Sequence, residues 1–108
     1  FAGKKGPVLA TAVVAGVQGA KRTSELIPFC HPVALDACDV SFEEQELALE
    51  VTCAVTTTHR TGVEMEALSG ASIAALAVYD MTKALSHSIT IEDLRLIEKT
   101  GGKSDYKT

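Results

Sequence analysis

The chain has 108 residues, a length typical of one domain that buries roughly 60–70% of its unfolded surface without disulfides. Its net charge of −4 at pH 7 argues against a general nucleic-acid binder, because such proteins need a surplus of Lys and Arg to neutralise phosphates. Only 5% of the residues are aromatic and none is Trp, which argues for a small aliphatic core and against a platform for stacking bases. A small phosphorylated molecule stays compatible with this charge, because it needs only a few local cations.

The cysteine content indicates a reducing compartment. Cys30, Cys38 and Cys53 form an odd-numbered set without close pairing, which fits reduced thiols better than a secreted disulfide framework. No stretch resembles a signal peptide or a membrane span. The chain begins with Phe rather than Met, so we expect a natural start upstream of it. We expect a cytoplasmic location, or a mitochondrial one if the source is eukaryotic.

The pattern of apolar residues predicts the order strand, helix, strand, strand, helix, strand. The expected ranges are 8–14, 15–27, 34–42, 47–55, 61–86 and 89–99. The first helix must end before Pro28, because the residue preceding a proline is pushed out of the helical region. Strict alternation from Leu47 to Val55 is typical of a strand with one buried face, and the polar residues 43–45 predict a hairpin turn before it.

The second helix has the clearest start signal. Thr61 stands three residues before Glu64, which is the spacing of a capping box. Residues 67–79 carry no charge, so this helix is expected to pack into the core rather than lie in water. The alternation of the last strand slips at Glu92-Asp93, which predicts a bulge, and residues 100–108 are expected to form a mobile tail.

This order of elements predicts the fold class. A single α+β domain over residues 1–108 is expected, of the ferredoxin-like βαββαβ sandwich type. Its antiparallel sheet would carry both helices on one face.

Acidic and basic residues mark the two ends of the second helix. Glu64 and Glu66 lie in its first turn, where the helix dipole favours carboxylates; capping explains Glu64 well and Glu66 less well. Asp80 and Lys83 share one face at the other end. A solvated ion pair is the commoner reason for that spacing, and a catalytic pair is the alternative.

His31 follows Cys30 in a loop constrained by prolines. A metal site that adds Cys38, Cys53 and His59 is disfavoured, because structural zinc sites use close Cys or His pairs. A loop histidine is better placed to hold a substrate group or to transfer a proton.

Glycines stand beside Lys5 and beside Lys103, near the two ends of the chain. The spacing around Lys103 does not match a phosphate-binding P-loop, because the required glycine is absent five positions earlier. Close approach of the backbone to an anion stays open at both places, and ordinary basic termini are the alternative.

Five segments are distinctive in sequence: Lys21 to Thr23, Leu26 to Pro32, Thr61 to Leu68, Tyr79 to Ala84, and Gly101 to Ser104. Together, in this order and over nearly the whole chain, they resemble the cyclic pyranopterin monophosphate synthase (MoaC) family of molybdenum-cofactor biosynthesis. The resemblance implies a lyase that converts 3′,8-cyclo-7,8-dihydroguanosine triphosphate into cyclic pyranopterin monophosphate and pyrophosphate. It implies no redox cofactor.

The resemblance also implies roles for particular residues. Asp80 would be the principal catalytic acid or base beside Lys83, and His31 would take part in proton transfer. Lys5 and Lys103 would serve the triphosphate or proton transfer. The substrate-binding residues would be Phe29, Cys30, His31, Glu64, Met65, Glu66 and Lys103. The assembly implied is a homo-oligomer, a hexamer built from three dimers.

The length of the second helix suggests how such a site is assembled. Glu66 and Asp80 are fourteen residues apart, which is roughly 20 Å along an unbroken helix. One subunit could hardly place both on the same reacting atoms. We therefore expect each site to be shared across a two-fold interface, with Glu66 and Met65 of one subunit facing Asp80 and Lys83 of the other.

Other functions stay open. A non-catalytic ferredoxin-like domain that binds or senses a ligand would have the same order of elements and no turnover. An RNA-binding domain is disfavoured, because residues 47–55 contain no aromatic side chain. An inactive paralogue is the third alternative, because Pro7 and Asp105 stand where the family usually has Asp and Gly.

Overall fold

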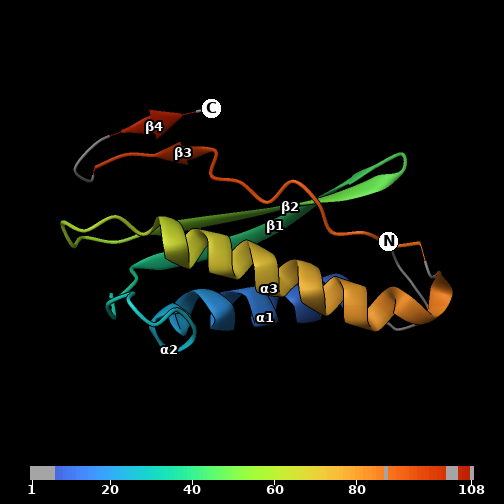
Figure 1. Cartoon of the computed structure of the whole chain (residues 1–108). Coiled ribbons are helices and arrows are strands. Elements are labelled where there is room, and N and C mark those ends of the chain that lie inside the picture. Colours follow the sequence, from blue (N-terminus) through green and yellow to red (C-terminus); the bar gives the residue numbers. More distant parts are fainter. Residues whose placement is uncertain (1–6, 87, 102–104, 108) are drawn as a thin grey trace.

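The computed structural model of the chain describes residues 7–86, 88–101 and 105–107. The elements are α1 (Val8–Lys21), α2 (Thr23–Leu26), β1 (Ala37–Gln45), β2 (Ala48–Thr56), α3 (Glu64–Thr82), the 3-10 helix η1 (Lys83–Leu85), β3 (Glu98–Lys99) and β4 (Tyr106–Lys107). Figure 1 shows α1 and α3 side by side, covering one face of the antiparallel hairpin β1–β2. The α+β class and the placement of both helices on one face are thus confirmed.

The predicted strand over 8–14 is wrong, because this segment is the first half of α1. Val8, Ala12, Gly16 and Ala20 are all buried, at the spacing of one helix face. A short run of apolar residues fits a strand as well as a buried helix, and packing against α3 decides between them. The helical path then continues through α2 and ends before Pro28, as predicted.

The two strands of the predicted hairpin are confirmed, with a shift of their ends. The register runs from Ala37 opposite Thr56 to Gln45 opposite Ala48, and Glu43 stands opposite Glu50. The turn predicted at 43–45 is wrong, because those residues pair in the ladder and the chain reverses at Glu46-Leu47. The odd-numbered residues from 49 to 55 are partly buried and the even-numbered ones are exposed, as the alternation predicts.

Small residues let the two long helices and the hairpin pack closely. A Cβ atom added at Gly70 would lie 2.5 Å from the Sγ of Cys53, and one at Gly16 would lie 2.9 Å from the backbone oxygen of Gly70. The buried apolar residues are Val8, Ala12, Ala20, Val40 and Ala74. This is the small aliphatic core that the composition predicts.

Helix α3 corrects two expectations. It begins at Glu64 with Val63 as the N-cap and no side-chain capping bond, so the capping box at Thr61 is wrong. Only one face of the uncharged stretch 67–79 is buried, since Leu76 is 52% exposed. An apolar face of α3 therefore lies on the surface of the chain.

The last predicted strand is largely wrong. Residues 88–97 have no ladder partner within the part of the chain that the structure describes, and only Glu98–Lys99 pairs, with Tyr106–Lys107. No ladder is present for the predicted bulge to interrupt; instead Asp93 has a φ of 59°, which breaks the extended run. The tail predicted to be mobile contains β4. Across the described ranges the sheets have two strands each, so a four-stranded ferredoxin-like sheet is not among them.

None of the helices in the described ranges has the length and apolar character needed to cross a membrane.

Candidate active site

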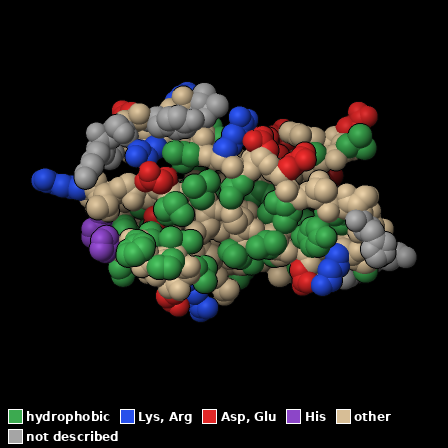
Figure 2. Space-filling view, in the orientation of Figure 1, with side chains coloured by type: hydrophobic (Ala, Val, Ile, Leu, Met, Phe, Trp, Pro, Cys, Tyr) green, Lys and Arg blue, Asp and Glu red, His purple; other side chains and the backbone are tan. Residues whose placement is uncertain are grey.

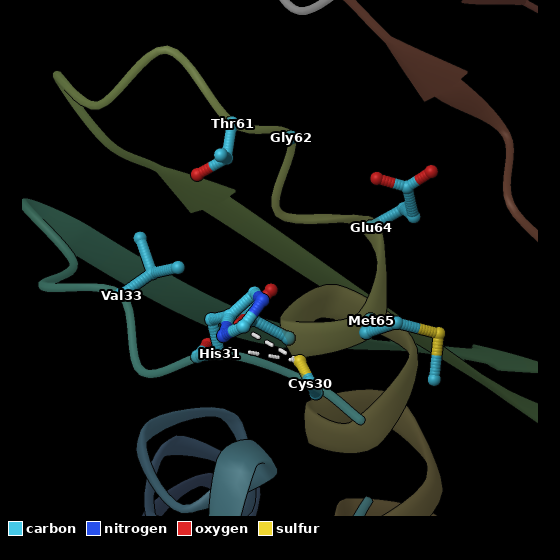
Figure 3. A pocket seen from close by; sticks show the side chains of 8 residues that line it. Cys30, His31, Val33, Thr61, Gly62, Glu64 and Met65 are labelled. Atoms are coloured by element: carbon cyan, nitrogen blue, oxygen red, sulfur yellow. Dashed lines mark hydrogen bonds between the residues drawn. The ribbon is translucent and has the colours of Figure 1, made fainter. Parts of the chain in front are cut away.

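A pocket of about 150 Å³ lies where the loop after α2 meets the loop before α3 and the first turn of that helix (Figure 3). Its lining residues are Cys30, His31, Val33, Thr61, Gly62, Glu64, Met65 and Glu66. Five of the eight, Cys30, His31, Glu64, Met65 and Glu66, are predicted site residues. Segments about thirty residues apart in sequence thus converge at this pocket.

The most deeply buried polar group of the pocket is the Glu66 side chain, which is 4% exposed. The Sγ of Cys30 donates a hydrogen bond to Glu66 Oε2 over 3.7 Å. Burial, and then the charge and the hydrogen bond of Glu66, raise the pKa of the Cys30 thiol. The pocket therefore favours the protonated form of the Cys30 thiol beside Glu66.

The sequence analysis missed Lys99, which does not line the pocket but pairs with the lining residue Glu64. Its Nζ lies 3.3 Å from Glu64 Oε2, and its side chain is 21% exposed. The ion pair brings a cation from β3 to the start of α3. No sequence spacing predicts this contact, because 35 residues separate the two partners.

The loop that carries Cys30 also presents its neighbours to solvent. His31 lines the pocket and is exposed, so its imidazole is accessible to a ligand. Phe29 is 96% exposed and is not among the lining residues. A benzyl group held in water this way is available to cover a ligand or a neighbouring chain.

Asp80 and Lys83 lie at the far end of α3 from the pocket. Lys83 Nζ donates to Asp80 Oδ1 over 2.8 Å, and both side chains are largely exposed. The hydrogen bond and the charge of Asp80 raise the pKa of the Lys83 amine, which keeps it protonated. Because α3 is continuous from Glu64 to Thr82, Asp80 stands roughly 20 Å from Glu66. A single chain does not bring these residues together.

Lys5 and Lys103 lie outside the described residues. Among those described, no three His, Cys, Asp or Glu side chains are grouped so that they could hold a metal ion. Cys38 and Cys53, both partly buried, face each other across the β1–β2 hairpin instead, with 3.9 Å between their sulfur atoms. Burial, followed by the neighbouring Cys38, raises the pKa of Cys53 to about 12.

Comparison with known proteins places this chain in a family. The model of the MoaC family matches residues 2–102. The cyclic pyranopterin monophosphate synthase of Xanthomonas oryzae pv. oryzae is 58% identical over 102 residues, which are 94% of this chain and 62% of that protein. The synthase of Listeria monocytogenes serotype 4b is 56% identical over 93% of this chain and 63% of its own length.

A longer relative also matches. The molybdenum cofactor biosynthesis bifunctional protein of Synechocystis sp. is 50% identical over 94% of this chain, which is 31% of the relative. The chain thus spans 62% of the length of the first curated relatives that it matches.

Proposed function

The chain belongs to the MoaC family, and from this we propose that it acts as a lyase of molybdenum-cofactor biosynthesis. The reaction proposed is the conversion of 3′,8-cyclo-7,8-dihydroguanosine triphosphate into cyclic pyranopterin monophosphate and pyrophosphate. The observation that carries the proposal is the pocket in which Cys30, His31 and Glu66 meet. A ring rearrangement requires groups that donate and accept protons, and these three side chains are of that kind.

Cations near the pocket suit the second part of the proposed reaction, the formation of the cyclic phosphate. Formation of the cyclic phosphate makes an alcohol oxygen attack the α-phosphorus while pyrophosphate departs, so negative charge builds on the leaving oxygens. We propose that Lys99, which pairs with the lining residue Glu64, stabilises that charge. We propose the same role for Lys5 and Lys103, on the strength of the family resemblance.

The size of the pocket supports a site that is completed by a second chain. A volume of about 150 Å³ is below the roughly 300–1,000 Å³ of pockets that enclose a drug-sized ligand. Asp80 and Lys83, which the resemblance makes catalytic, are at the wrong end of α3 to reach this pocket in their own subunit. We propose that Asp80 of the partner subunit supplies the missing group.

The exposed face of α3 offers the contact surface for this arrangement. Met65, Leu68, Ser72, Leu76 and Tyr79 follow one another at helical spacing, and three of them are exposed large apolar residues. A groove of about 340 Å³ runs beside this face. It is lined by Leu26, Ile27, Met65, Leu68, Ser69, Ser72, Ile73 and Leu94. Figure 2 shows hydrophobic side chains gathered on this face of the molecule, over α1 and α3.

A two-fold axis gives the proposed contact a specific register. Residue 73 is midway between Glu66 and Asp80 in sequence. Two α3 helices that pack antiparallel about a two-fold axis near Ile73 would place Glu66 of each subunit opposite Asp80 of the partner subunit. Three such dimers in a hexamer, as the family resemblance implies, remain part of the proposal.

Two further points extend the proposal. The order α1, β1, β2, α3 supplies the αββα centre of a ferredoxin-like βαββαβ fold, which supports that fold for the protein. The three cysteines are free thiols, which supports a reducing compartment such as the cytoplasm.

The direct test is to incubate the protein with the cyclised dihydro-GTP substrate and to measure pyrophosphate. Turnover that disappears in Glu66→Gln, with an unchanged circular dichroism spectrum, is the expected result. Binding of the substrate without release of pyrophosphate would point instead to a ligand-binding domain.

Sharing of the site is tested by mixing two inactive variants. Asp80→Ala and Glu66→Ala chains are unfolded together, refolded together and assayed against each variant alone. Random pairing makes half of the dimers mixed, each with one intact site, so recovery of about a quarter of the wild-type activity is expected. No recovery, with mixed dimers confirmed by mass spectrometry, would count against sharing.

A further inference from the structure

Glu66 combines a carboxylate with deep burial, and few groups accompany it. Its side chain is 4% exposed. Within the described ranges, the thiol of Cys30 is the one group that donates a hydrogen bond to it. A buried carboxylate is costly without a donor, so its position depends on this contact.

The backbone holds Cys30 in place for this contact. Its N–H donates to the carbonyl of Ile27 over 3.0 Å, which fixes the loop on both sides of Pro28. The sulfur also lies 3.9 Å from the carbonyl oxygen of His31 (Figure 3). The thiol is therefore set between the loop and the first turn of α3, and two acceptors surround it.

Two acceptors around a thiol favour its protonated form. The reactive form of cysteine is the thiolate, and a neighbouring cation or helix N-terminus favours it by lowering the thiol pKa. Here Glu66 contacts the thiol, and after burial it is the group that raises the thiol pKa. The sulfur is thus suited to donate a hydrogen and unsuited to attack a substrate.

We propose that Cys30 is a positioning residue, whose thiol hydrogen orients the Glu66 carboxylate toward the ligand in the pocket. The second oxygen of Glu66 is then left to receive an N–H or O–H group of the substrate ring. This inference deepens the proposed function, on which its kinetic test rests; its chemical test does not need turnover.

The chemical test measures alkylation of Cys30 by iodoacetamide between pH 7 and pH 10, by peptide mass spectrometry. Glu66→Gln removes the neighbouring charge, so the Cys30 pKa falls. The thiolate fraction at a given pH then rises and outweighs the lower nucleophilicity, so alkylation of Cys30 is expected to be about threefold faster in Glu66→Gln than in the wild type. Cys38 and Cys53 in the same samples serve as internal controls, with unchanged rates. Equal Cys30 rates in the wild type and in Glu66→Gln would overturn the proposal.

The kinetic test compares Cys30→Ala with Cys30→Ser. Loss of the donor in Cys30→Ala is expected to lower kcat about tenfold and to leave KM within about twofold of the wild type. The effect falls on kcat because the misplaced Glu66 carboxylate acts on the reacting ring. The hydroxyl of Cys30→Ser donates as well, so kcat within about threefold of the wild type is expected. Equal losses in both variants, or none in Cys30→Ala, would overturn the positioning role. A wild type without turnover would defeat the proposed function, and the alkylation result would still decide the link between Cys30 and Glu66.

Discussion

Lys99 and Glu64 join the C-terminal segment to the start of α3, with 3.3 Å between Nζ and Oε2. Both side chains are partly shielded from water, unlike those of the Asp93–Arg95 pair, which are well exposed. The pair takes the place of the capping contact expected between Thr61 and Glu64. It makes Glu64, a lining residue of the pocket, depend on the C-terminal segment of the chain.

This contact predicts a loss of stability in Lys99→Ala. A partly shielded ion pair contributes about 1 kcal/mol, whereas an exposed one contributes about 0.5 kcal/mol or less. The free energy of unfolding in urea should therefore fall by about 1 kcal/mol in Lys99→Ala and by less than half of that in the control Arg95→Ala. Equal losses in the two variants would show that Lys99 is no more than a surface charge.

Gly70 should not tolerate a side chain. A Cβ atom there would lie 2.5 Å from the Cys53 sulfur and 3.2 Å from the Gly16 oxygen, so α3 would have to move away from the sheet. Gly70→Ala is expected to cost about 1–3 kcal/mol in urea unfolding, as overpacked cores do. The double variant Gly70→Ala with Cys53→Ala should recover part of that loss. A double variant less stable than the sum of the two single changes would contradict the contact.

The raised pKa of Cys53 predicts that the free energy of unfolding falls as the pH rises above 9. Its pKa is raised from 9.0 to about 12 in the folded chain by burial and by Cys38. Above pH 9 the unfolded chain loses the thiol proton while the folded chain keeps it, so the unfolded state is favoured as the pH rises toward 12. The urea midpoint should therefore fall more between pH 8 and pH 10.5 in the wild type than in Cys53→Ala. Parallel curves would contradict the assignment.

Asp80 should matter for activity and little for folding. Its pair with Lys83 is largely exposed, so Asp80→Asn should change the unfolding free energy by less than about 0.5 kcal/mol. The same change should lower kcat by at least about a hundredfold, as loss of an acid or base does. The Lys83 pKa should fall as well, since Asp80 raises it. Full activity in Asp80→Asn would remove this residue from the proposed mechanism.

Periodicity was sufficient to predict the hairpin and α3. Alternation from Leu47 to Val55 predicts one buried face, and residues 49–55 have that face toward the helices; Leu47 is 96% exposed, because it lies in the turn beyond the ladder. Periodicity was insufficient for residues 8–14, because Val8 and Ala12 are as consistent with a strand as with a helix until α3 packs against them. The prediction of the last strand was wrong for a different reason. Residues 89–97 would form a strand only if a neighbouring strand paired with them, and the local sequence does not specify such a partner.

The pocket was predictable in part. Cys30 and His31 stand out because prolines flank them, and Glu66 because capping does not need it. Lys99 could not be found this way, because its contact with Glu64 exists only after the chain has folded.

The hairpin carries a consequence for how copies of the chain meet in solution. Glu43 and Glu50 stand directly opposite each other on its exposed side, and Glu46 lies at the turn beyond them. Like charges in opposed positions weaken the β1–β2 ladder slightly. They also repel the same segment of a second chain that would pair with the edge of the hairpin. If hairpins of several chains stacked edge to edge, the carboxylates of Glu43, Glu46 and Glu50 would lie beside those of the neighbouring chains. This end of the molecule therefore resists growth into a cross-β fibre.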